Sequence, residues 1–320
     1  MNNQVLVLGG AGFVGSNIAK KFFENGYHVT VIDGLLSQTG GRKENIQALL
    51  PELTFVHARV EDYKELGNTI SRHDLIIDCM AWTAHKEALR YPEYDLQLNV
   101  LSHLHFIQSL LHISKTDRKI IYLASRGQYG RVSGTEIHET TPMHPVDIQG
   151  VHKLTSESYY RIYSELNNLN VISLRFPNCF GINQPFLTED IGLVGGFIID
   201  LLQDKTIEIF GAGRKRNLVY ASDIAEIVFQ LSQQSFKGFN PINAAGHQIS
   251  IENLVIRLRE IIQRGQYKFT PMPKKIKKID MGNLPIAEHC LREHIGEVLK
   301  TDLHEALSAT VEYFKKVVVE

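Results

Sequence analysis

Residues 5–15 read Val5-Leu-Val-Leu-Gly9-Gly-Ala-Gly12-Phe-Val-Gly15. A short apolar run ends in glycines three residues apart, and a segment with apolar residues at helical spacing then continues to Asn25. Glycine is required where a tight turn from strand to helix brings backbone N–H groups and a helix N-terminus against a pyrophosphate. The stretch therefore predicts the first strand, loop and helix of a dinucleotide-binding unit.

A second apolar run, His28–Ile32, ends at Asp33, which follows the glycines by the roughly 20 residues typical of such units. A carboxylate at this point accepts hydrogen bonds from the adenosine ribose hydroxyls and repels a 2′-phosphate. Asp33 therefore predicts NAD as the cofactor in preference to NADP.

Short apolar runs alternate with amphipathic segments along the first half of the chain, which favours a parallel sheet covered by helices on both faces. The runs are Val5–Leu8, His28–Ile32, Leu53–Val56, Leu75–Ile77, Lys119–Leu123 and Val171–Leu174. We expect an α/β fold with a doubly wound parallel sheet and a smaller, mostly C-terminal substrate lobe. The expected division gives residues 1–176 to the sheet domain, with 218–242 returning to it, and residues 177–217 and 243–320 to the lobe.

Composition excludes several classes of function. The chain has 320 residues and a net charge of −1, which provides no field to attract nucleic acid or an anionic membrane. No apolar stretch reaches the roughly 18–20 residues of a membrane span, and the N-terminus lacks the features of a leader, so a cytoplasmic protein is expected. The basic run Lys274–Lys278 is interpreted as a solvated loop. Neither the three cysteines nor the histidines show the spacing of a metal site, and no metal is expected.

Over roughly residues 5–225 the sequence resembles the extended short-chain dehydrogenase/reductase family, which includes nucleotide-sugar epimerases, dehydratases, decarboxylases and reductases. The glycines follow that family's G-x-x-G-x-x-G spacing, and similar segments follow in the family's order. These segments span residues 74–82, 95–100, 124–130, 149–157, 174–181 and 211–223. The resemblance implies a Rossmann domain, a nucleotide-sugar substrate and a homodimer formed partly by the helix that carries Leu96, Val100, Leu104, Ile107 and Leu111.

The resemblance also implies roles for individual residues. Ser125 would bond the sugar hydroxyl that is oxidised or reduced near carbon 4, and Lys153 would bind the nicotinamide ribose. Substrate contacts are expected from Ser125, Arg126, Asn178 and Arg216, the last two at the phosphates or nucleotide. Cofactor contacts are expected from Gly9, Gly12, Phe13, Val14, Gly15, Asp33, Val60, Met80, Ala81, Asn99 and Lys153.

The most consequential departure from the family is Gln149. The family has a tyrosine acid/base four residues before the lysine, whereas an amide cannot move a proton at neutral pH. The candidates to move the proton instead are His152, Asp147, His144, His85, Ser125 and a water held by Gln149.

Two further positions differ from the family pattern. Arg126 and Gly127 stand where the family's 4,6-dehydratases have an Asp-Glu pair, so the elimination of water would lack its acid. Arg59 stands where an acidic residue often lies near the adenine, and its side chain is expected either to stack on the adenine or to be exposed.

The sequence thus predicts NAD-dependent oxidoreduction of a nucleotide-linked sugar, at carbon 4, by an epimerase or a dehydrogenase. The expected catalytic residues are Ser125, Gln149 and Lys153. Gln149 leaves one alternative open, a catalytically silent protein that binds NAD and a nucleotide sugar.

Overall fold

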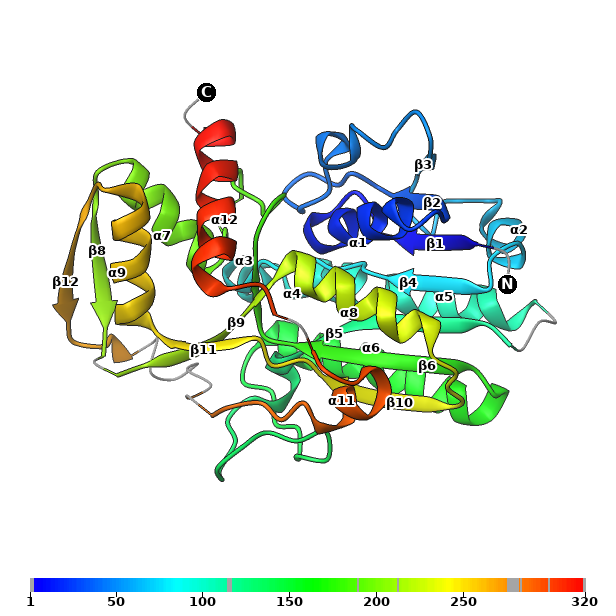
Figure 1. Cartoon of the computed structure of the whole chain (residues 1–320). Coiled ribbons are helices and arrows are strands. Elements are labelled where there is room, and N and C mark those ends of the chain that lie inside the picture. Colours follow the sequence, from blue (N-terminus) through cyan, green and yellow to red (C-terminus); the bar gives the residue numbers. More distant parts are fainter. Residues whose placement is uncertain are drawn as a thin grey trace.

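The computed structural model describes residues 3–113, 117–188, 190–211, 213–274, 282, 284–298 and 300–318. Its central sheet has seven strands in the order β10-β6-β5-β4-β1-β2-β3 (Figure 1). All neighbouring strands of this sheet run parallel. The strands are β1 (Gln4–Leu8), β2 (His28–Asp33), β3 (Thr54–His57), β4 (Leu75–Asp78), β5 (Lys119–Ser125), β6 (Asn170–Phe176) and β10 (Phe239–Asn243). The chain winds outward from β1 in both directions, which confirms the predicted doubly wound α/β fold.

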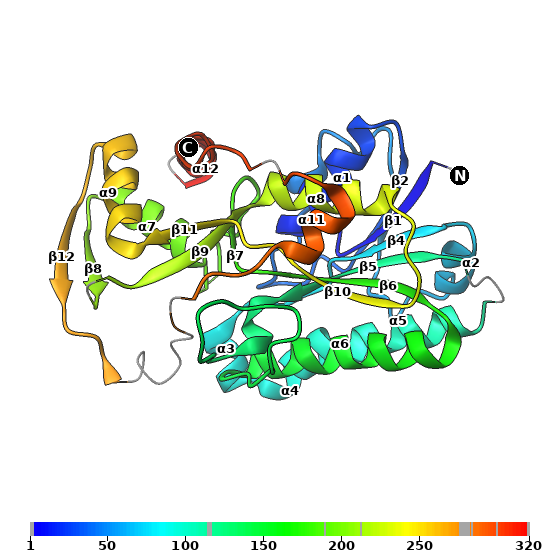
Figure 2. The ribbon, with the colours of Figure 1, turned by 60° about the horizontal axis from the view of Figure 1, so that its bottom comes forward.

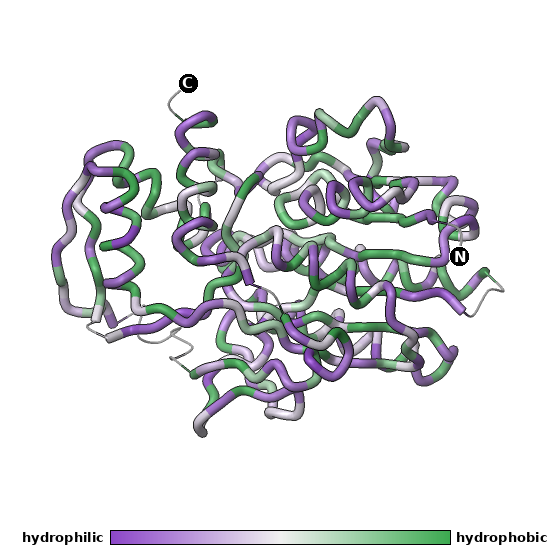
Figure 3. Tube along the Cα trace, in the orientation of Figure 1, coloured by the Kyte–Doolittle hydropathy of each residue, from purple (hydrophilic) through white to green (hydrophobic). Residues whose placement is uncertain are grey.

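Helices cover both faces of the sheet, and this explains why its central strands are apolar throughout (Figures 2 and 3). One face carries α1 (Phe13–Glu24), α8 (Ala221–Gln233) and the short α11 (His289–Ile295). The other face carries α2 (Leu66–Ser71), α5 (Ser102–Leu111) and α6 (Ile148–Asn167).

The connection from β4 to α5 is built from short helical pieces. These pieces are α3 (His85–Arg90), α4 (Pro92–Leu96) and a π-helical turn, η2 (Gln97–Leu101). Two 3-10 turns, η1 (Lys43–Ile46) and η3 (Arg126–Tyr129), follow β2 and β5. These connections leave the carboxyl ends of the strands, where parallel α/β sheets bind their ligands.

A smaller lobe lies beside this end of the sheet, at the left of Figure 1. It contains α7 (Leu193–Leu202), α9 (Ile251–Ile262) and α12 (Leu303–Val318), packed around buried residues such as Val194, Leu254 and Phe314. Its strands β8 (Thr206–Phe210) and β12 (Gln266–Thr270) pair in parallel. A three-stranded sheet of β7 (Asn178–Phe180), β9 (Lys215–Tyr220) and β11 (His247–Ser250) links the lobe to the sheet domain. Of the basic run at 274–278, residues 275–278 lie outside the described residues.

Candidate active site

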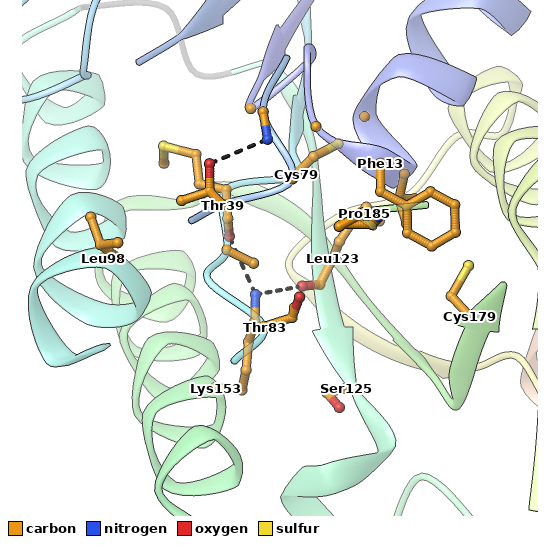
Figure 4. A pocket seen from close by; sticks show the side chains of 18 of the residues that line it. Phe13, Thr39, Cys79, Thr83, Leu98, Leu123, Ser125, Lys153, Cys179 and Pro185 are labelled. Carbon is orange, nitrogen blue, oxygen red and sulfur yellow. Dashed lines mark hydrogen bonds between the residues drawn. The ribbon is translucent and has the colours of Figure 1, made fainter. Parts of the chain in front are cut away.

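A cleft of about 450 Å³ opens between the carboxyl ends of β1, β2, β4 and β5 and the start of the smaller lobe (Figure 4). Its wall includes the glycine loop, the segment after β4, the end of β5 and Lys153 from α6. The lobe contributes Asn178 and the segment around Gly192. Segments that are far apart in the sequence thus meet around one cavity.

The glycine loop has no room for side chains. A Cβ on Gly15 would lie 2.2 Å from the carbonyl oxygen of Gly9, and Gly9 itself has φ +69°. Gly12 is the N-cap of α1 and has no side chain that could cap the helix, and this helix N-terminus faces the cleft. The loop Gly9–Gly15 and the N-terminus of α1, which we call the glycine cradle, fit the pyrophosphate of a dinucleotide.

Asp33 ends β2 at the wall of the same cleft. Its Oδ2 accepts a hydrogen bond from the Ala11 N–H at 3.0 Å, and its Oδ1 accepts one from the Leu35 N–H at 2.8 Å. Burial raises the pKa of Asp33, while these N–H groups act in the opposite direction. A carboxylate has about four lone-pair directions, so acceptor capacity remains for two ribose hydroxyls.

Lys153 is a largely buried part of the cleft wall, and its ammonium donates to the carbonyl oxygens of Leu123 at 3.1 Å and Met80 at 3.4 Å (Figure 4). Burial lowers the pKa of Lys153 to about 8. Ser125 lies at the end of β5, and its hydroxyl oxygen accepts the Gly127 N–H at 3.0 Å. The two predicted residues therefore lie on adjacent elements of one cavity.

Gln149 does not line the cleft among the described residues. Its amide nitrogen donates to the Trp82 carbonyl oxygen at 2.7 Å and to Asp95 Oδ2 at 3.3 Å. Asp95 Oδ1 in turn contacts His152 Nδ1 at 2.5 Å, in a buried position. Gln149 and His152, two residues singled out in the sequence, are therefore engaged with Asp95 behind the cleft wall.

Asn99 also binds the backbone of Trp82. Its Oδ1 accepts the Trp82 N–H at 3.0 Å, and its Nδ2 donates to the Trp82 carbonyl oxygen at 2.8 Å. Asn99 and Gln149 together fix the segment between β4 and α3, which carries Met80 and Ala81 into the cleft.

His85 enters the cleft from the first turn of α3. Its Nδ1 lies 3.3 Å from Asp147 Oδ2, and its side chain is 54% exposed. Burial lowers the pKa of His85, but the hydrogen bond and charge of Asp147, with smaller effects of Asp190 and Asp95, outweigh it and leave that pKa raised. Asp147 is a helix cap as well, because its Oδ1 accepts the Gly150 N–H at 2.7 Å.

Most residues predicted from the sequence line the cleft. They are Gly9, Gly12, Phe13, Val14, Gly15, Asp33, Val60, Met80, Ala81, Ser125, Arg126, Lys153 and Asn178. Arg59 also lines it and forms an ion pair with Glu61 at 3.2 Å. Arg216 lies elsewhere, on β9, where it donates to the carbonyl oxygens of Lys215 and Gly282.

Several lining residues were not predicted. They include Thr39, Gly40 and Gly41 after β2, Thr83 before α3, and Gln184, Pro185, Asp190, Ile191, Gly192 and Leu193 before and at the start of α7. Among these residues, only Gly40-Gly41 showed a local signal in the sequence, because two glycines indicate a turn. The other residues reach the cleft through the tertiary fold. Over the described ranges, no helix is long and apolar enough to span a bilayer, and no set of three or more His, Cys, Asp or Glu side chains is arranged to hold a metal ion.

Comparison with known proteins gives consistent matches. The family model described as NAD dependent epimerase/dehydratase family matches residues 5–245. A putative UDP-glucose 4-epimerase of Methanocaldococcus jannaschii is 33% identical over 227 residues, which cover 69% of this chain and 71% of the relative. The crystal structure of UDP-glucose 4-epimerase with UDP-glucose from Thermotoga maritima is 27% identical, with a TM-score of 0.86 over 98% of this chain and 99% of that chain. A dTDP-glucose 4,6-dehydratase from Streptomyces venezuelae, 20% identical, shares the fold with a TM-score of 0.85 over 98% of this chain and 97% of that chain.

Proposed function

Because this chain belongs to the NAD dependent epimerase/dehydratase family, with NAD as its cofactor, we propose that it oxidises and then reduces carbon 4 of a nucleotide-linked sugar. The observation that carries the proposal is the meeting of the glycine cradle, Lys153 and Ser125 in one cleft. A redox site for a sugar needs its cofactor loop and its hydroxyl-binding groups around the same space. The 4-epimerase names of the similar proteins support carbon 4 and favour epimerisation over net dehydrogenation.

Each part of the cleft has a separate task in this reaction. Bound NAD supplies the acceptor and donor of hydride. The helix N-terminus of α1 and Asp33 would hold the dinucleotide between them, and Lys153 would donate to its nicotinamide ribose. The ammonium of Lys153 also adds positive charge beside the hydroxyl oxygen, which stabilises charge that develops there.

The substrate side begins at Ser125, whose hydroxyl bonds the sugar hydroxyl. Asn178 and Arg126 line the same cleft and would bind the diphosphate-bearing part of the substrate. Arginine suits this task because its planar guanidinium donates two parallel hydrogen bonds to phosphate. Arg216 lies outside the lining of the cleft, so its sequence-based role at the nucleotide has no support from this geometry.

Dehydration of the sugar is not part of the proposed reaction. Arg126 and Gly127 follow Ser125, and neither supplies a carboxylic acid to protonate a leaving hydroxyl. A mass spectrum of the reaction products tests this, because a dehydratase product is lighter than the substrate by one water.

The test of the proposed function is turnover with NAD and a panel of UDP-, dTDP-, GDP- and CDP-linked sugars, followed by proton NMR. An epimerase yields the carbon-4 epimer without net NADH, whereas a dehydrogenase accumulates NADH in proportion to product. The alternative, a silent binding protein, predicts that NAD and a nucleotide sugar bind together and that neither product nor NADH forms.

We also propose that the protein is a homodimer. Apolar side chains of α4, η2 and α6 are exposed to solvent in the single chain: Leu96, Leu101, Val151, Ile162 and Leu166. We call these five residues the α4–α6 surface. A second copy of the chain would bury this surface by contacts between like helices, and large exposed apolar areas mark such interfaces.

A further inference from the structure

We propose that the His85 imidazole, oriented by Asp147, accepts the proton of the sugar hydroxyl during oxidation and returns it during reduction. The inference rests on the proposed function and supplies the acid/base that Gln149 cannot provide. His85 and Asp147 lie 62 positions apart in the sequence, and the fold brings Nδ1 and Oδ2 to 3.3 Å at the cleft.

The position of the pair fits this task. Asp147 caps α6, and its turn packs against the strand-end loop of Ser125, because a Cβ on Gly150 would lie 2.8 Å from the Gly127 carbonyl oxygen. The backbone N–H of His85 donates to Asp190 Oδ2 at 2.8 Å, and this bond holds the first turn of α3 in place. His85 therefore lies at the same cleft as Ser125, with Asp147 contacting its ring and Asp190 its backbone.

The other candidate groups are already engaged. His152 is buried against Asp95, and Gln149 donates to Trp82 and Asp95. Lys153 donates to two carbonyl oxygens, and a serine hydroxyl has too high a pKa to take up a proton by itself. His85 is the only imidazole among the described residues that line the cleft.

The tautomer follows from the contact with Asp147. When Nδ1–H donates to the Asp147 carboxylate, Nε2 carries the lone pair and accepts the proton. In the oxidation, the O–H and C–H bonds of carbon 4 break and a C=O bond forms, while the proton moves to Nε2 and the hydride to NAD. The reduction reverses these changes from the opposite face of the sugar, so no further oxidant or base is required.

The charges around His85 determine the direction of its pH dependence. Asp147, Asp190 and Asp95 all favour the protonated ring and outweigh the effect of burial, so the pKa of His85 is raised. Oxidation needs the neutral ring, so its rate rises with pH through this pKa. Asp147→Asn keeps the helix cap but removes the charge that raises the pKa of His85 most. The substitution should therefore lower the pKa of the ring and shift the rate profile to lower pH.

The experiment compares His85→Gln, Asp147→Asn and the control His138→Gln, all with NAD bound. His138 is a matched control, because it pairs with Glu136 at 3.6 Å and lies outside the cleft lining. We expect His85→Gln to lower kcat by about 100-fold or more with little change in KM, in line with general acid–base catalysis. The His138→Gln variant should keep the kcat of the unchanged protein.

Two readouts separate proton transfer from a structural role. Free imidazole should restore part of the turnover of His85→Ala but none of that of Lys153→Met. NMR titration of histidine-labelled protein, with the signal assigned from the His85→Gln spectrum, should give a lower pKa in Asp147→Asn than in the unchanged protein, and this readout does not depend on turnover.

The inference is wrong if His85→Gln keeps the kcat and pH profile of an active unchanged protein, or if imidazole rescues nothing while the variant still binds NAD. The proposed function fails in a different way, when the unchanged protein itself converts no nucleotide sugar.

Discussion

Among single residues, Asp33 is the one that we propose selects NAD over NADP. Its buried carboxylate would meet the 2′-phosphate of NADP in a site of low polarity, where like charges repel strongly. We expect NAD to bind at least about tenfold more tightly than NADP, or about 1.4 kcal/mol. Asp33→Asn should narrow this ratio, while it keeps one acceptor for the Ala11 or Leu35 N–H. Titration calorimetry measures both affinities, and equal affinities for the unchanged protein would contradict the assignment.

The buried ammonium of Lys153 lowers the free energy of unfolding. Its pKa falls from 10.5 to about 8 because burial disfavours the charged form, so the unfolded chain binds more protons between these values. The resulting destabilisation is complete below pH 8, shrinks as pH rises, and has vanished above 10.5.

Lys153→Met should therefore raise the free energy of unfolding of the cofactor-free protein at pH 7 by up to about 3 kcal/mol, while it abolishes turnover. This difference in the free energy of unfolding between Lys153→Met and the unchanged protein should shrink between pH 8 and 10. Denaturant unfolding at several pH values checks this, with exposed Lys20→Met as the control that changes little. A variant less stable than the unchanged protein at pH 7 would contradict the prediction.

The sequence was informative for residues whose role depends on local chain geometry. Gly9, Gly12, Gly15 and Asp33 follow each other within one strand-helix-strand unit, so their spacing alone predicts their place in the cleft. Gln149 differs, because its bonds to Trp82 and Asp95 depend on how α6 packs against the segment after β4. No local pattern contains that information.

At the scale of the element, the first turn of α6 holds the segment between β4 and α3. Gln149→Leu should leave the Asp95 carboxylate and the Trp82 carbonyl with fewer donors and lower the stability by about 1–3 kcal/mol. Thermal unfolding measures the loss, and the same substitution at exposed Gln47 is the control. An unchanged midpoint for Gln149→Leu would show that the amide holds nothing in place.

The predicted strands match the observed ones to within a few residues, because an apolar run buried on both faces has few alternatives. Val5–Leu8 became β1 (Gln4–Leu8), and Val171–Leu174 became the longer β6 (Asn170–Phe176). The helical pattern that follows the glycines and continues to Asn25 corresponds to α1 (Phe13–Glu24). The lobe's strands could not be predicted in the same way. β7 and β9 are far apart in the sequence, and their pairing depends on the tertiary fold.

At the scale of the whole molecule, the α4–α6 surface should hold two copies together. The double substitution Leu101→Glu and Leu166→Glu places charges on this surface and should shift the protein from dimer to monomer in analytical ultracentrifugation. Leu187→Glu is the control, since Leu187 is at least as exposed as Leu101 and Leu166 but lies outside the α4–α6 surface. A monomeric unchanged protein, or a double variant that stays dimeric, would contradict this interface.

Hydride transfer at carbon 4 can be tested by following the hydrogen on that carbon of the sugar. A nucleotide sugar with deuterium at this carbon is incubated with the NAD-bound protein, and the products are analysed by NMR and mass spectrometry. We expect the carbon-4 epimer with the deuterium kept at carbon 4, because the hydride would leave to NAD and return to the same carbon. An unchanged substrate across the whole nucleotide-sugar panel, or an epimer whose deuterium has exchanged with water, would contradict it.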